Sequence, residues 1–412
     1  MRYTVRQLIL CILILSCGFG VAAQPARGNW IPTMHAPATI LSVGWTTVIL
    51  DDGSILGLGN SSGGDANSKA YRYDFKTNDW TQTGPLPVDV VGLKPVKVLN
   101  GKVMALGVFL KTQRPVALIF DPATMQWALT GAVPADNLRF GAKVLSLSNG
   151  NALVLGLSDK KYGGWIYDYQ TNSWSLTEPM PIEIKDFSYA TNLKEGSVLV
   201  VANDRSLQGK WVGFLYDPKN DSWTSTGTLP VVMGSSPSGF ATLKDETVLL
   251  IGYRQSPYVG MAAVVYHPDS KTWTQTDEIP NELLSVGAAR QLPNGLVITS
   301  ASESMGKGVF SPLFNPATNK WITGTKLSSD YQGLAILGTQ PDGMVWGMGY
   351  RYGSGTDELV YSSVLKKWTK VGAMPEEIIG IQNTGQADGS VLIFIKTRSG
   401  LDVKTDAVLF TP

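Results

Sequence analysis

Residues 149–174 read NGNALVLGLSDKKYGGWIYDYQTNSW, and this one stretch holds the signals that recur along the chain. The pair Asn149-Gly150 precedes an apolar run at residues 152–155. Asn-Gly between apolar runs is a strong hairpin signal, because both central residues of such a turn take positive φ angles. Further on, Tyr167 precedes Trp174 by seven positions, with polar turn formers between them. The stretch therefore predicts strands joined by a glycine turn and then by a polar turn.

The spacing of Tyr167 and Trp174 returns along almost the whole chain. An aromatic residue stands seven positions before a tryptophan in Tyr73/Trp80, Phe120/Trp127, Tyr167/Trp174, Tyr216/Trp223, Tyr266/Trp273, Phe314/Trp321 and Tyr361/Trp368. Runs such as Asp217-Pro218-Lys219-Asn220 lie between them, and proline with Asp or Asn is typical of tight turns. Each unit is therefore predicted to be strand, turn, strand.

The glycine turn keeps the same period. It recurs at Asp52-Gly53, Asn100-Gly101, Asn149-Gly150, Glu195-Gly196, Asn294-Gly295, Asp342-Gly343 and Asp388-Gly389, while Asp245-Glu246 lacks the glycine. Each unit thus has four strands, A to D, with the glycine turn joining A to B and the polar turn joining C to D. Four-stranded units repeated every 40 to 50 residues predict an all-β fold, the β-propeller. A two-sheet sandwich would not explain the constant interval.

The two ends of the chain predict how the ring closes. Phe410-Thr411-Pro412 matches the first three positions of a C–D turn, and the missing tryptophan strand is supplied by Trp30 near the N-terminus. This 3+1 closure leaves no free strand edge. We therefore expect eight four-stranded blades, with seven blades and a stray strand at Trp30 as the alternative.

The combined pattern resembles the kelch repeat family. Gly196-Ser197-Val198-Leu199-Val200-Val201, followed by Tyr216-Asp217-Pro218 and Trp223, is one instance, and the resemblance covers residues 24–412. Kelch repeats usually end strand B with a Gly-Gly pair, whereas one glycine or none is found here. The resemblance implies a kelch-type propeller and leaves the functional subfamily open.

The N-terminus predicts export. Residues 1–23 combine Arg2 and Arg6, an apolar run at residues 8–15 and small residues before position 24, as a signal peptide does. We expect two segments, the signal peptide at 1–23 and the propeller at 24–412, and a secreted or periplasmic location. A lipid anchor on Cys17 is the alternative. The apolar run is too short to span a bilayer and no second one follows, so no transmembrane segment is expected in the mature chain.

Composition restricts the chemistry. The 412 residues include 34 Lys+Arg and 33 Asp+Glu, a balance that argues against nucleic acid as a partner. The two cysteines, Cys11 and Cys17, fall in the predicted signal, and the two histidines are His35 and His267. His35 is expected in the first D–A crossing and His267 in a C–D turn, on opposite faces. A metal site or other cofactor is therefore not expected. Galactose oxidase, a secreted kelch-like enzyme, would need cysteine and paired histidines for its copper.

Functional residues of a propeller are expected on the variable loops of one face. Here the A–B and C–D turns are uniform, whereas the B–C loops vary and carry basic and aromatic residues. Arginine offers a planar donor fork to carboxylates, phosphates or sulfates, and aromatic faces stack on sugars. The predicted ligand-binding residues are Arg205, Arg254, Tyr258, Arg351, Tyr352 and Arg398. Pairing of these charges with local acids such as Asp204 and Glu303 is the alternative.

The sequence thus favours a binding module for a protein partner or an extracellular carbohydrate, more than an enzyme. The alternative is a cofactor-free carbohydrate-active enzyme, such as a sialate-type sugar epimerase or a lyase. Acid and base groups for such an enzyme could come from the D–A crossings, at Asp136, Arg139, Glu183, Lys185, Asp186, Glu282 and Asp330. No phosphate loop, serine-hydrolase elbow or zinc motif is found. An enzyme should show a facing acid–base pair within hydrogen-bond reach, and a binder an exposed aromatic or basic patch.

The export prediction can be checked by mass spectrometry of the protein expressed with residues 1–23 in a bacterial host. We expect the mature chain to begin at Gln24, because small residues precede that position. A mature chain that begins at a lipidated Cys17 would support the anchor instead, and an uncleaved chain would contradict export.

Overall fold

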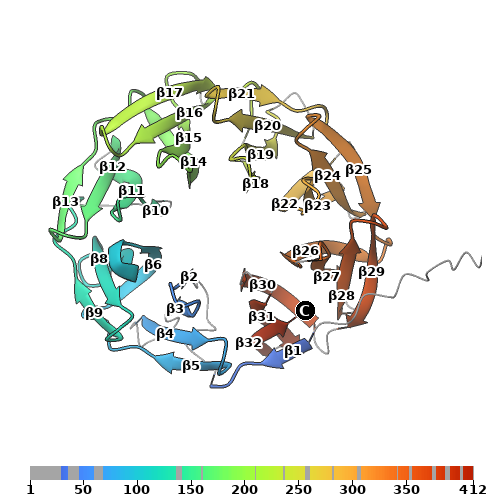
Figure 1. Ribbon diagram of the computed structural model, residues 1–412, viewed down its shortest axis with the longest axis horizontal. Coiled ribbons are helices and arrows are strands. Elements are labelled where there is room, and N and C mark those ends of the chain that lie inside the picture. The colour runs from blue at the N-terminus through green and yellow to red at the C-terminus, as the bar shows by residue number, and fades with distance from the viewer. Residues whose placement is uncertain are drawn as a thin grey trace, which may run out of the picture.

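The structure is a computed structural model that holds eight four-stranded antiparallel blades in a ring (Figure 1). It describes residues 29–35, 46–59, 68–135, 142–158, 161–208, 210–234, 237–255, 260–280, 283–303, 308–340, 342–351, 355–373, 377–385, 390–399 and 402–411. The predicted signal peptide, with Cys11 and Cys17, lies outside these ranges. The prediction of eight blades is confirmed and the seven-blade alternative is wrong.

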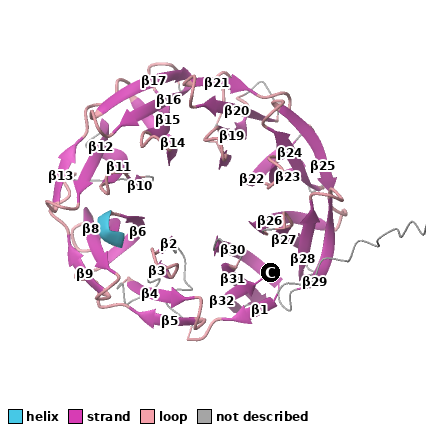
Figure 2. Cartoon of the chain, viewed as in Figure 1, coloured by secondary structure: helices cyan, strands magenta, loops and turns pink. Residues whose placement is uncertain are grey.

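Each blade has its A strand innermost and its D strand at the rim (Figure 2). The first blade comprises β2 (Thr46–Ile49), β3 (Ile55–Gly59), β4 (Lys69–Asp74) and β5 (Asp79–Gln82). The second comprises β6 (Val90–Lys97), β7 (Val103–Phe109), β8 (Arg114–Asp121) and β9 (Gln126–Leu129), with the 3-10 helix η1 (Leu99–Gly101) at its A–B turn. The third comprises β10 (Lys143–Ser146), β11 (Ala152–Ser158), β12 (Lys161–Asp168) and β13 (Ser173–Leu176). The fourth comprises β14 (Ile184–Asn192), β15 (Val198–Asp204), β16 (Lys210–Asp217) and β17 (Ser222–Thr228).

The remaining blades repeat this order. The fifth comprises β18 (Gly239–Thr242), β19 (Val248–Tyr253), β20 (Met261–His267) and β21 (Thr272–Gln275). The sixth comprises β22 (Leu283–Gln291), β23 (Val297–Glu303), β24 (Val309–Asn315) and β25 (Lys320–Lys326). The seventh comprises β26 (Tyr331–Thr339), β27 (Val345–Arg351), β28 (Gly355–Ser362) and β29 (Lys367–Ala373). The eighth comprises β30 (Glu377–Gly385), β31 (Val391–Ser399), β32 (Asp402–Thr411) and the N-terminal β1 (Asn29–Pro32).

The ring closes through its first strand, as the sequence predicts. β1 pairs antiparallel with β32, and Trp30 stands opposite Phe410. Their ring centroids are 4.9 Å apart. The first and last strands of the chain therefore share one sheet, and β32 has a strand partner on each side.

The core lies between neighbouring blades, and the B strands are its centre. Every residue of β15 is buried, as are the first five of β19. Val200 packs among residues of the third and fourth blades, whereas Val201 packs toward the fifth. Because alternate side chains of one strand face two neighbours, a B strand must be apolar on both faces, and its sequence is a continuous apolar run.

The seven repeated tryptophans stand directly opposite the C-strand aromatics. In Tyr216/Trp223 the ring centroids are 4.7 Å apart, and in Tyr361/Trp368 they are 5.4 Å apart. The turn between each pair contains one residue with positive φ, five positions after the aromatic residue. These residues are Asn78, Met125, Asn172, Asp221, Lys271, Asn319 and Lys366. Where that residue is Asn or Asp and the aromatic is tyrosine, its side chain accepts the tyrosine hydroxyl, as in Tyr167 to Asn172 at 2.9 Å.

Each of these tryptophans also binds the preceding blade through its indole N–H. Trp127 Nε1 donates to Thr83 Oγ1 at 2.9 Å, and Trp321 Nε1 donates to Thr276 Oγ1 at 2.9 Å. In most of these joints the acceptor is a threonine three positions after the preceding tryptophan, but Trp223 Nε1 donates to Glu178 O and Trp368 Nε1 donates to Ser311 Oγ. At the closing joint that position is Val371, which cannot accept, and Trp30 Nε1 is buried without a partner among the described residues.

The A–B turns differ in one respect from the prediction. Only the second residue of the signal has positive φ, as at Gly53 and Gly150; Asn100-Gly101 is the exception, where both residues do. The turns are type I turns followed by a left-handed residue, since Gly53 N donates to Leu50 O and Leu50 N donates to Ser54 O. Glu246 takes the glycine place at φ 67°, and its carboxylate accepts from Lys194 N of the fourth blade.

The described residues hold no helix of the length and hydropathy that crossing a membrane requires.

Loss of one indole acceptor should weaken the joint between two blades. We expect Thr83→Val to lower the free energy of unfolding by about 1–3 kcal/mol, because the buried Trp127 N–H loses its acceptor. The exposed Thr81 on the same strand gives the control Thr81→Val, expected to be near neutral. Val371→Thr should raise stability by about 1 kcal/mol by giving Trp30 an acceptor. Urea unfolding measures all three, and equal effects of Thr83→Val and Thr81→Val would contradict the role of the indole bond.

Candidate functional site

The predicted arginines emerge at one edge of the ring, where B strands end and C strands begin; we call it the B–C edge. Arg205 follows the last residue of β15, Arg254 follows β19, and Arg351 is the last residue of β27. Arg398 is in β31, but its side chain lies outside what the structure describes, as do Tyr258 and Tyr352. The role of these residues in binding stays a prediction.

Arg351 is engaged inside its own blade. Its Nη2 donates to Asp357 Oδ1 at 2.7 Å, and Lys370 Nζ lies 2.9 Å from the same oxygen. Tyr331 donates its hydroxyl to the other oxygen, Asp357 Oδ2, at 2.6 Å. The carboxylate is 1% exposed, so this network links all four strands of the seventh blade. Arg351 therefore fits the alternative stated for these residues, in which a local acid forms an ion pair with the arginine.

The network shifts the acid–base behaviour of its members. Burial alone would raise the pKa of Asp357, but hydrogen bonds from Tyr331 and Lys370 and the nearby positive charges outweigh it, and the pKa lies below its usual value. Burial and the hydrogen bond to Asp357 raise the pKa of Tyr331. Carboxylate and phenol are thus both held in their neutral-pH forms, one charged and one neutral.

Arg205 and Arg254 are in a different environment. Neither has a carboxylate at ion-pair distance among the described residues, and Asp204 instead accepts bonds from Ser206. Glu303 pairs with Lys326 at 3.7 Å. The positive charges of Arg205 and Arg254 are therefore not neutralised by a described acid, and an anionic ligand could bind them.

An aromatic pair lies on the inner strands of the same two blades. Phe240 is the second residue of β18 and is 51% exposed, and its ring centroid is 4.8 Å from that of Tyr189 on β14. Tyr189 Oη lies 3.1 Å from Thr242 Oγ1, which links the two strands. Because A strands begin at the B–C edge, Phe240 lies toward the edge that carries Arg205 and Arg254. We call Tyr189, Arg205, Phe240 and Arg254 the blade 4–5 surface. The two aromatic residues were missed from the sequence, since inner strands carry no repeated motif.

Three cations on inner strands were also missed. They are Lys94 on β6, Lys143 on β10 and Arg290 on β22, and none has an ion pair with the described residues. Burial and the charge of Lys143 lower the pKa of Lys94, whose Nζ donates to Ala142 O at 2.5 Å. Arg290 Nε is buried without a partner among those residues, and burial lowers the pKa of the side chain. The strands nearest the axis therefore carry positive charge.

The two histidines lie apart. His267 ends β20, in the C–D turn as expected, and its Nε2 lies 2.8 Å from Thr274 Oγ1. His35 is not beside the B–C edge, and that expectation is wrong: its Nδ1 lies 2.9 Å from Asp79 Oδ1, at the first residue of β5. The reason is that the chain after β1 runs along the next blade, where Met34 N donates to Asn78 O. Within the described residues no three His, Cys, Asp or Glu side chains come together as a metal site would need.

The acids and bases predicted from the D–A crossings lie in different surroundings. Asp136, Arg139 and Glu282 lie outside the described residues. Asp186 accepts a bond from Phe187 N, and the backbone oxygen of Glu183 accepts from Arg205 N. A close acid–base contact in this part of the ring is the buried one between Tyr331 and Asp357. Its carboxylate is already bound by two cations.

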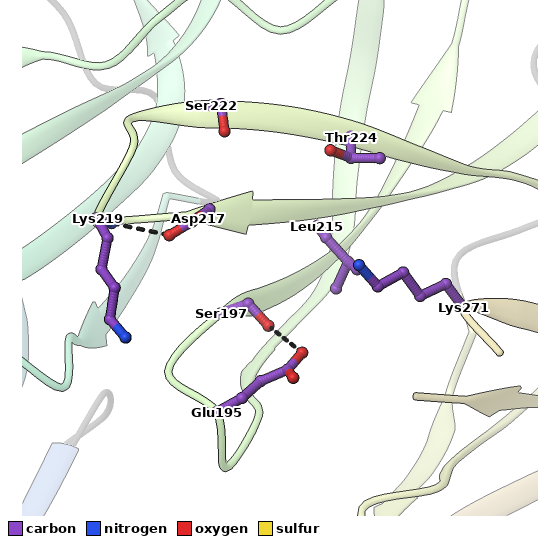
Figure 3. A pocket seen from close by; sticks show the side chains of 8 residues that line it. All are labelled: Glu195, Ser197, Leu215, Asp217, Lys219, Ser222, Thr224 and Lys271. Atoms are coloured by element: carbon purple, nitrogen blue, oxygen red, sulfur yellow. Dashed lines mark hydrogen bonds between the residues drawn. The ribbon is translucent and has the colours of Figure 1, made fainter. Parts of the chain in front are cut away.

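Two pockets lie at the opposite edge, where the A–B and C–D turns meet; we call it the turn edge. A pocket of about 370 Å³ lies between the fourth and fifth blades and is lined by Glu195, Ser197, Leu215, Asp217, Lys219, Ser222, Thr224 and Lys271 (Figure 3). Another of about 460 Å³ lies between the second and third blades and includes Tyr167 and Tyr169. These pockets could not be predicted from the uniform turn sequences, because each pocket is lined by residues of two blades.

No protein-family profile matches the chain, and no curated protein matches it significantly. A solved structure of a novel fungal alcohol oxidase, with catalytic diversity among the AA5 family and in complex with copper, is similar in fold. The TM-score is 0.52 at 13% sequence identity, and the match covers 93% of this chain and 92% of that one. At this identity the likeness shows the fold alone, and a kelch-type propeller is compatible with it.

Removal of the Asp357 charge should destabilise the protein in a pH-dependent way. We expect Asp357→Asn to cost about 3 kcal/mol at pH 7, because Arg351 and Lys370 lose their buried carboxylate. The folded pKa of Asp357 is depressed, so its contribution is present above the unfolded pKa of about 3.9 and is lost as pH falls through the folded value. The difference between variant and wild type should therefore shrink in strong acid.

Urea unfolding at pH 7 and at pH 3 measures this. Asp342→Asn is the matched control, since Asn294 accepts the same kind of turn hydrogen bond in the neighbouring blade. A cost of Asp357→Asn equal to that of Asp342→Asn would contradict the role of the network.

Proposed function

We propose that this chain is an exported binding propeller whose blade 4–5 surface takes an anionic extracellular glycan. The observation that carries the proposal is Phe240, a ring half exposed on an inner strand and stacked on Tyr189. An aromatic side chain on an inner strand would ordinarily be covered, because its burial stabilises the fold by about 2 kcal/mol. A ring that stays open to the solvent on this strand supports a binding role.

The chemistry of the surface supports a sugar with negative charge. Aromatic faces offer an apolar plane for the C–H face of a sugar ring. Arg205 and Arg254, which form no ion pair with described residues, offer donor forks for carboxylate or sulfate groups. The inner-strand cations Lys94 and Lys143 add positive potential near the axis, which attracts anions over a distance set by the salt concentration.

The copper named for the fungal oxidase does not fit the residues of this chain. Copper(II) sites are built from imidazole and other nitrogen and oxygen ligands in one small volume. His35 is tied to Asp79 at the ring's rim, and His267 belongs to the C–D turn of the fifth blade. The described residues bring no third ligand to either one. We therefore derive no copper chemistry for this protein.

The alternative of a cofactor-free epimerase or lyase has weaker support. Such an enzyme needs an acid and a base that can both reach a substrate. Tyr331 and Asp357 are within hydrogen-bond reach, but both are buried and Asp357 is closed off by Arg351 and Lys370. A protein partner at the blade 4–5 surface is the remaining alternative, and the test below distinguishes it.

Binding should depend on both parts of the surface. We expect Phe240→Ala, and separately the double change Arg205→Ala/Arg254→Ala, to weaken glycan binding about tenfold or more, because each removes contacts worth roughly 1.5–3 kcal/mol. A glycan array on residues 24–412 identifies the ligand, and calorimetry measures the affinity. The double arginine variant should also lose the salt dependence of binding.

The matched control is Val364→Ala, an exposed side chain in the C–D turn of the seventh blade. It should bind as the wild type does. No glycan binding by the wild type, or wild-type affinity in both surface variants, would contradict the proposal. Capture of one extracellular protein that requires Phe240 would support the protein partner instead.

A further inference from the structure

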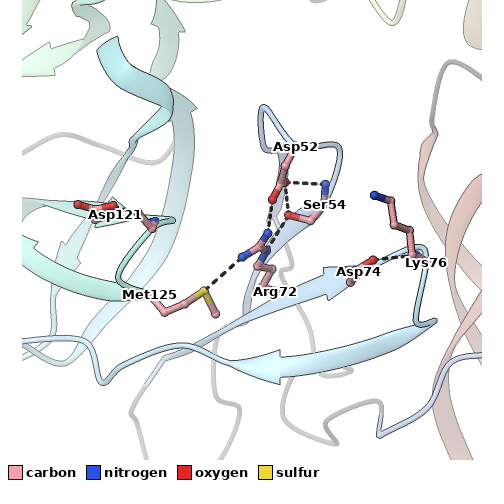
Figure 4. Close-up of polar contacts among 8 residues, drawn as sticks. Asp52, Ser54, Arg72, Asp74, Lys76, Asp121 and Met125 are labelled. Atoms are coloured by element: carbon pink, nitrogen blue, oxygen red, sulfur yellow. Dashed lines mark hydrogen bonds and ion pairs between the residues drawn. The ribbon is translucent and has the colours of Figure 1, made fainter.

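At the turn edge, an arginine closes the groove between the first and second blades. Arg72, on β4, ion-pairs through Nη2 with Asp52 of the A–B turn and donates from Nε to Ser54 Oγ at 2.8 Å (Figure 4). Its Nη1 reaches Met125 of the next blade at 3.9 Å. An arginine from the C strand thus fills the space between the two blades.

The fourth blade has the same groove without the arginine. Aligned on the strand registers, Leu215 takes the place of Arg72, Glu195 and Ser197 take the places of Asp52 and Ser54, and Lys271 takes that of Met125. Leucine cannot reach the turn, and a pocket of about 370 Å³ opens there. This lies within the range of roughly 300–1,000 Å³ that small-molecule sites occupy.

A buried hydroxyl beside the pocket lacks an acceptor. Tyr266 is fully buried, and its Oη has no partner among the described residues. The equivalent hydroxyls of Tyr167 and Tyr216 donate to Asn172 and Asp221, but the residue at this position here is Lys271, which cannot accept. Burial, with the charge of Glu195 as a smaller cause, raises the pKa of Tyr266 to about 12, so the phenol keeps its proton. Unsatisfied buried donors are rare and call for an acceptor.

The polar groups around the pocket are of three kinds. Lys219 and Lys271 lie on opposite sides of it, with the A–B turn between them (Figure 3), and neither forms an ion pair with described residues. Glu195 and Asp217 bring carboxylates, and the hydroxyls of Ser197, Ser222 and Thr224 complete the wall. Two ammonium groups suit a carboxylate, whereas carboxylates and hydroxyls suit a ligand with several O–H groups.

We propose that this pocket binds a monosaccharide acid of the hexuronate class. The ligand carboxylate accepts from Lys271, and Lys219 lies across the pocket from Lys271. The ring hydroxyls donate to Glu195 and exchange hydrogen bonds with Ser197 and Thr224. The site lies at the turn edge, so it is independent of the blade 4–5 surface at the B–C edge.

The test is calorimetric titration of residues 24–412 with galacturonate and glucuronate, beside galactose, glucose and acetate. A uronate should bind more tightly than its neutral sugar by about tenfold or more, because charged hydrogen bonds contribute roughly 1.5–3 kcal/mol. It should also bind more tightly than acetate, which lacks the hydroxyls. Affinity equal to that of the neutral sugar, or to that of acetate, overturns the proposal.

Two variants place the ligand in the pocket. Leu215→Arg installs the side chain that closes the groove in the first blade, and Lys271→Asn restores the acceptor that Asn172 supplies to Tyr167. Each change copies the residue that another blade has at the equivalent position. Each should weaken uronate binding about tenfold or more, and Lys271→Asn should also raise the stability by giving Tyr266 a partner.

Lys366→Asn is the matched control, because Lys366 has the same left-handed turn position in the seventh blade. It should leave uronate affinity unchanged, as should Phe240→Ala. Loss of uronate binding in Phe240→Ala, or wild-type affinity in both Leu215→Arg and Lys271→Asn, places the ligand elsewhere and overturns the proposal.

Discussion

The ring depends on two contacts that one tryptophan makes at the start of each D strand. Its face packs on the aromatic residue that ends the C strand, and in Phe120/Trp127 the centroids are 4.9 Å apart. Its N–H binds the preceding blade, through Thr83 in the case of Trp127. One side chain thus closes its own blade and fixes that blade to the preceding one. This contact adds a hydrogen bond to the apolar packing between the two blades. The joint at Trp30 and Val371 is the one described joint at which the N–H has no acceptor.

Residues that depart from the repeat stand where the structure has a special contact or an open space between blades. Glu246 replaces a turn glycine and binds the neighbouring turn at Lys194. This departure is satisfied within the protein. Lys271 stands where other blades cap a tyrosine, and the hydroxyl of Tyr266 has no partner among the described residues. Arg72 is also a departure, because it fills the groove of the first blade at the position where the fourth blade has Leu215 and an open pocket.

Residues of one type at equivalent positions have different roles because their surroundings differ. Arg351 and Arg254 both stand where a B strand ends, yet Arg351 binds a carboxylate that is 1% exposed, whereas Arg254 forms no ion pair with the residues that the structure describes. The position of an arginine along the repeat predicts its edge of the ring. Whether the charge is used internally depends on the C and D strands of the same blade, which bring Asp357 and Lys370 beside Arg351.

The sequence by itself determined the all-β fold, the eight blades and the closure through Trp30. These features follow from local turn chemistry and from the nearly constant spacing of the repeats. Both can be seen directly in the order of the residues. It also placed Arg205 and Arg254 at the B–C edge. Tertiary structure alone decided that His35 lies at the rim beside Asp79, that Phe240 stacks on Tyr189, and that a pocket opens at Leu215. Each of these is a contact between two blades, and residues about 50 positions apart meet there only after the ring has closed.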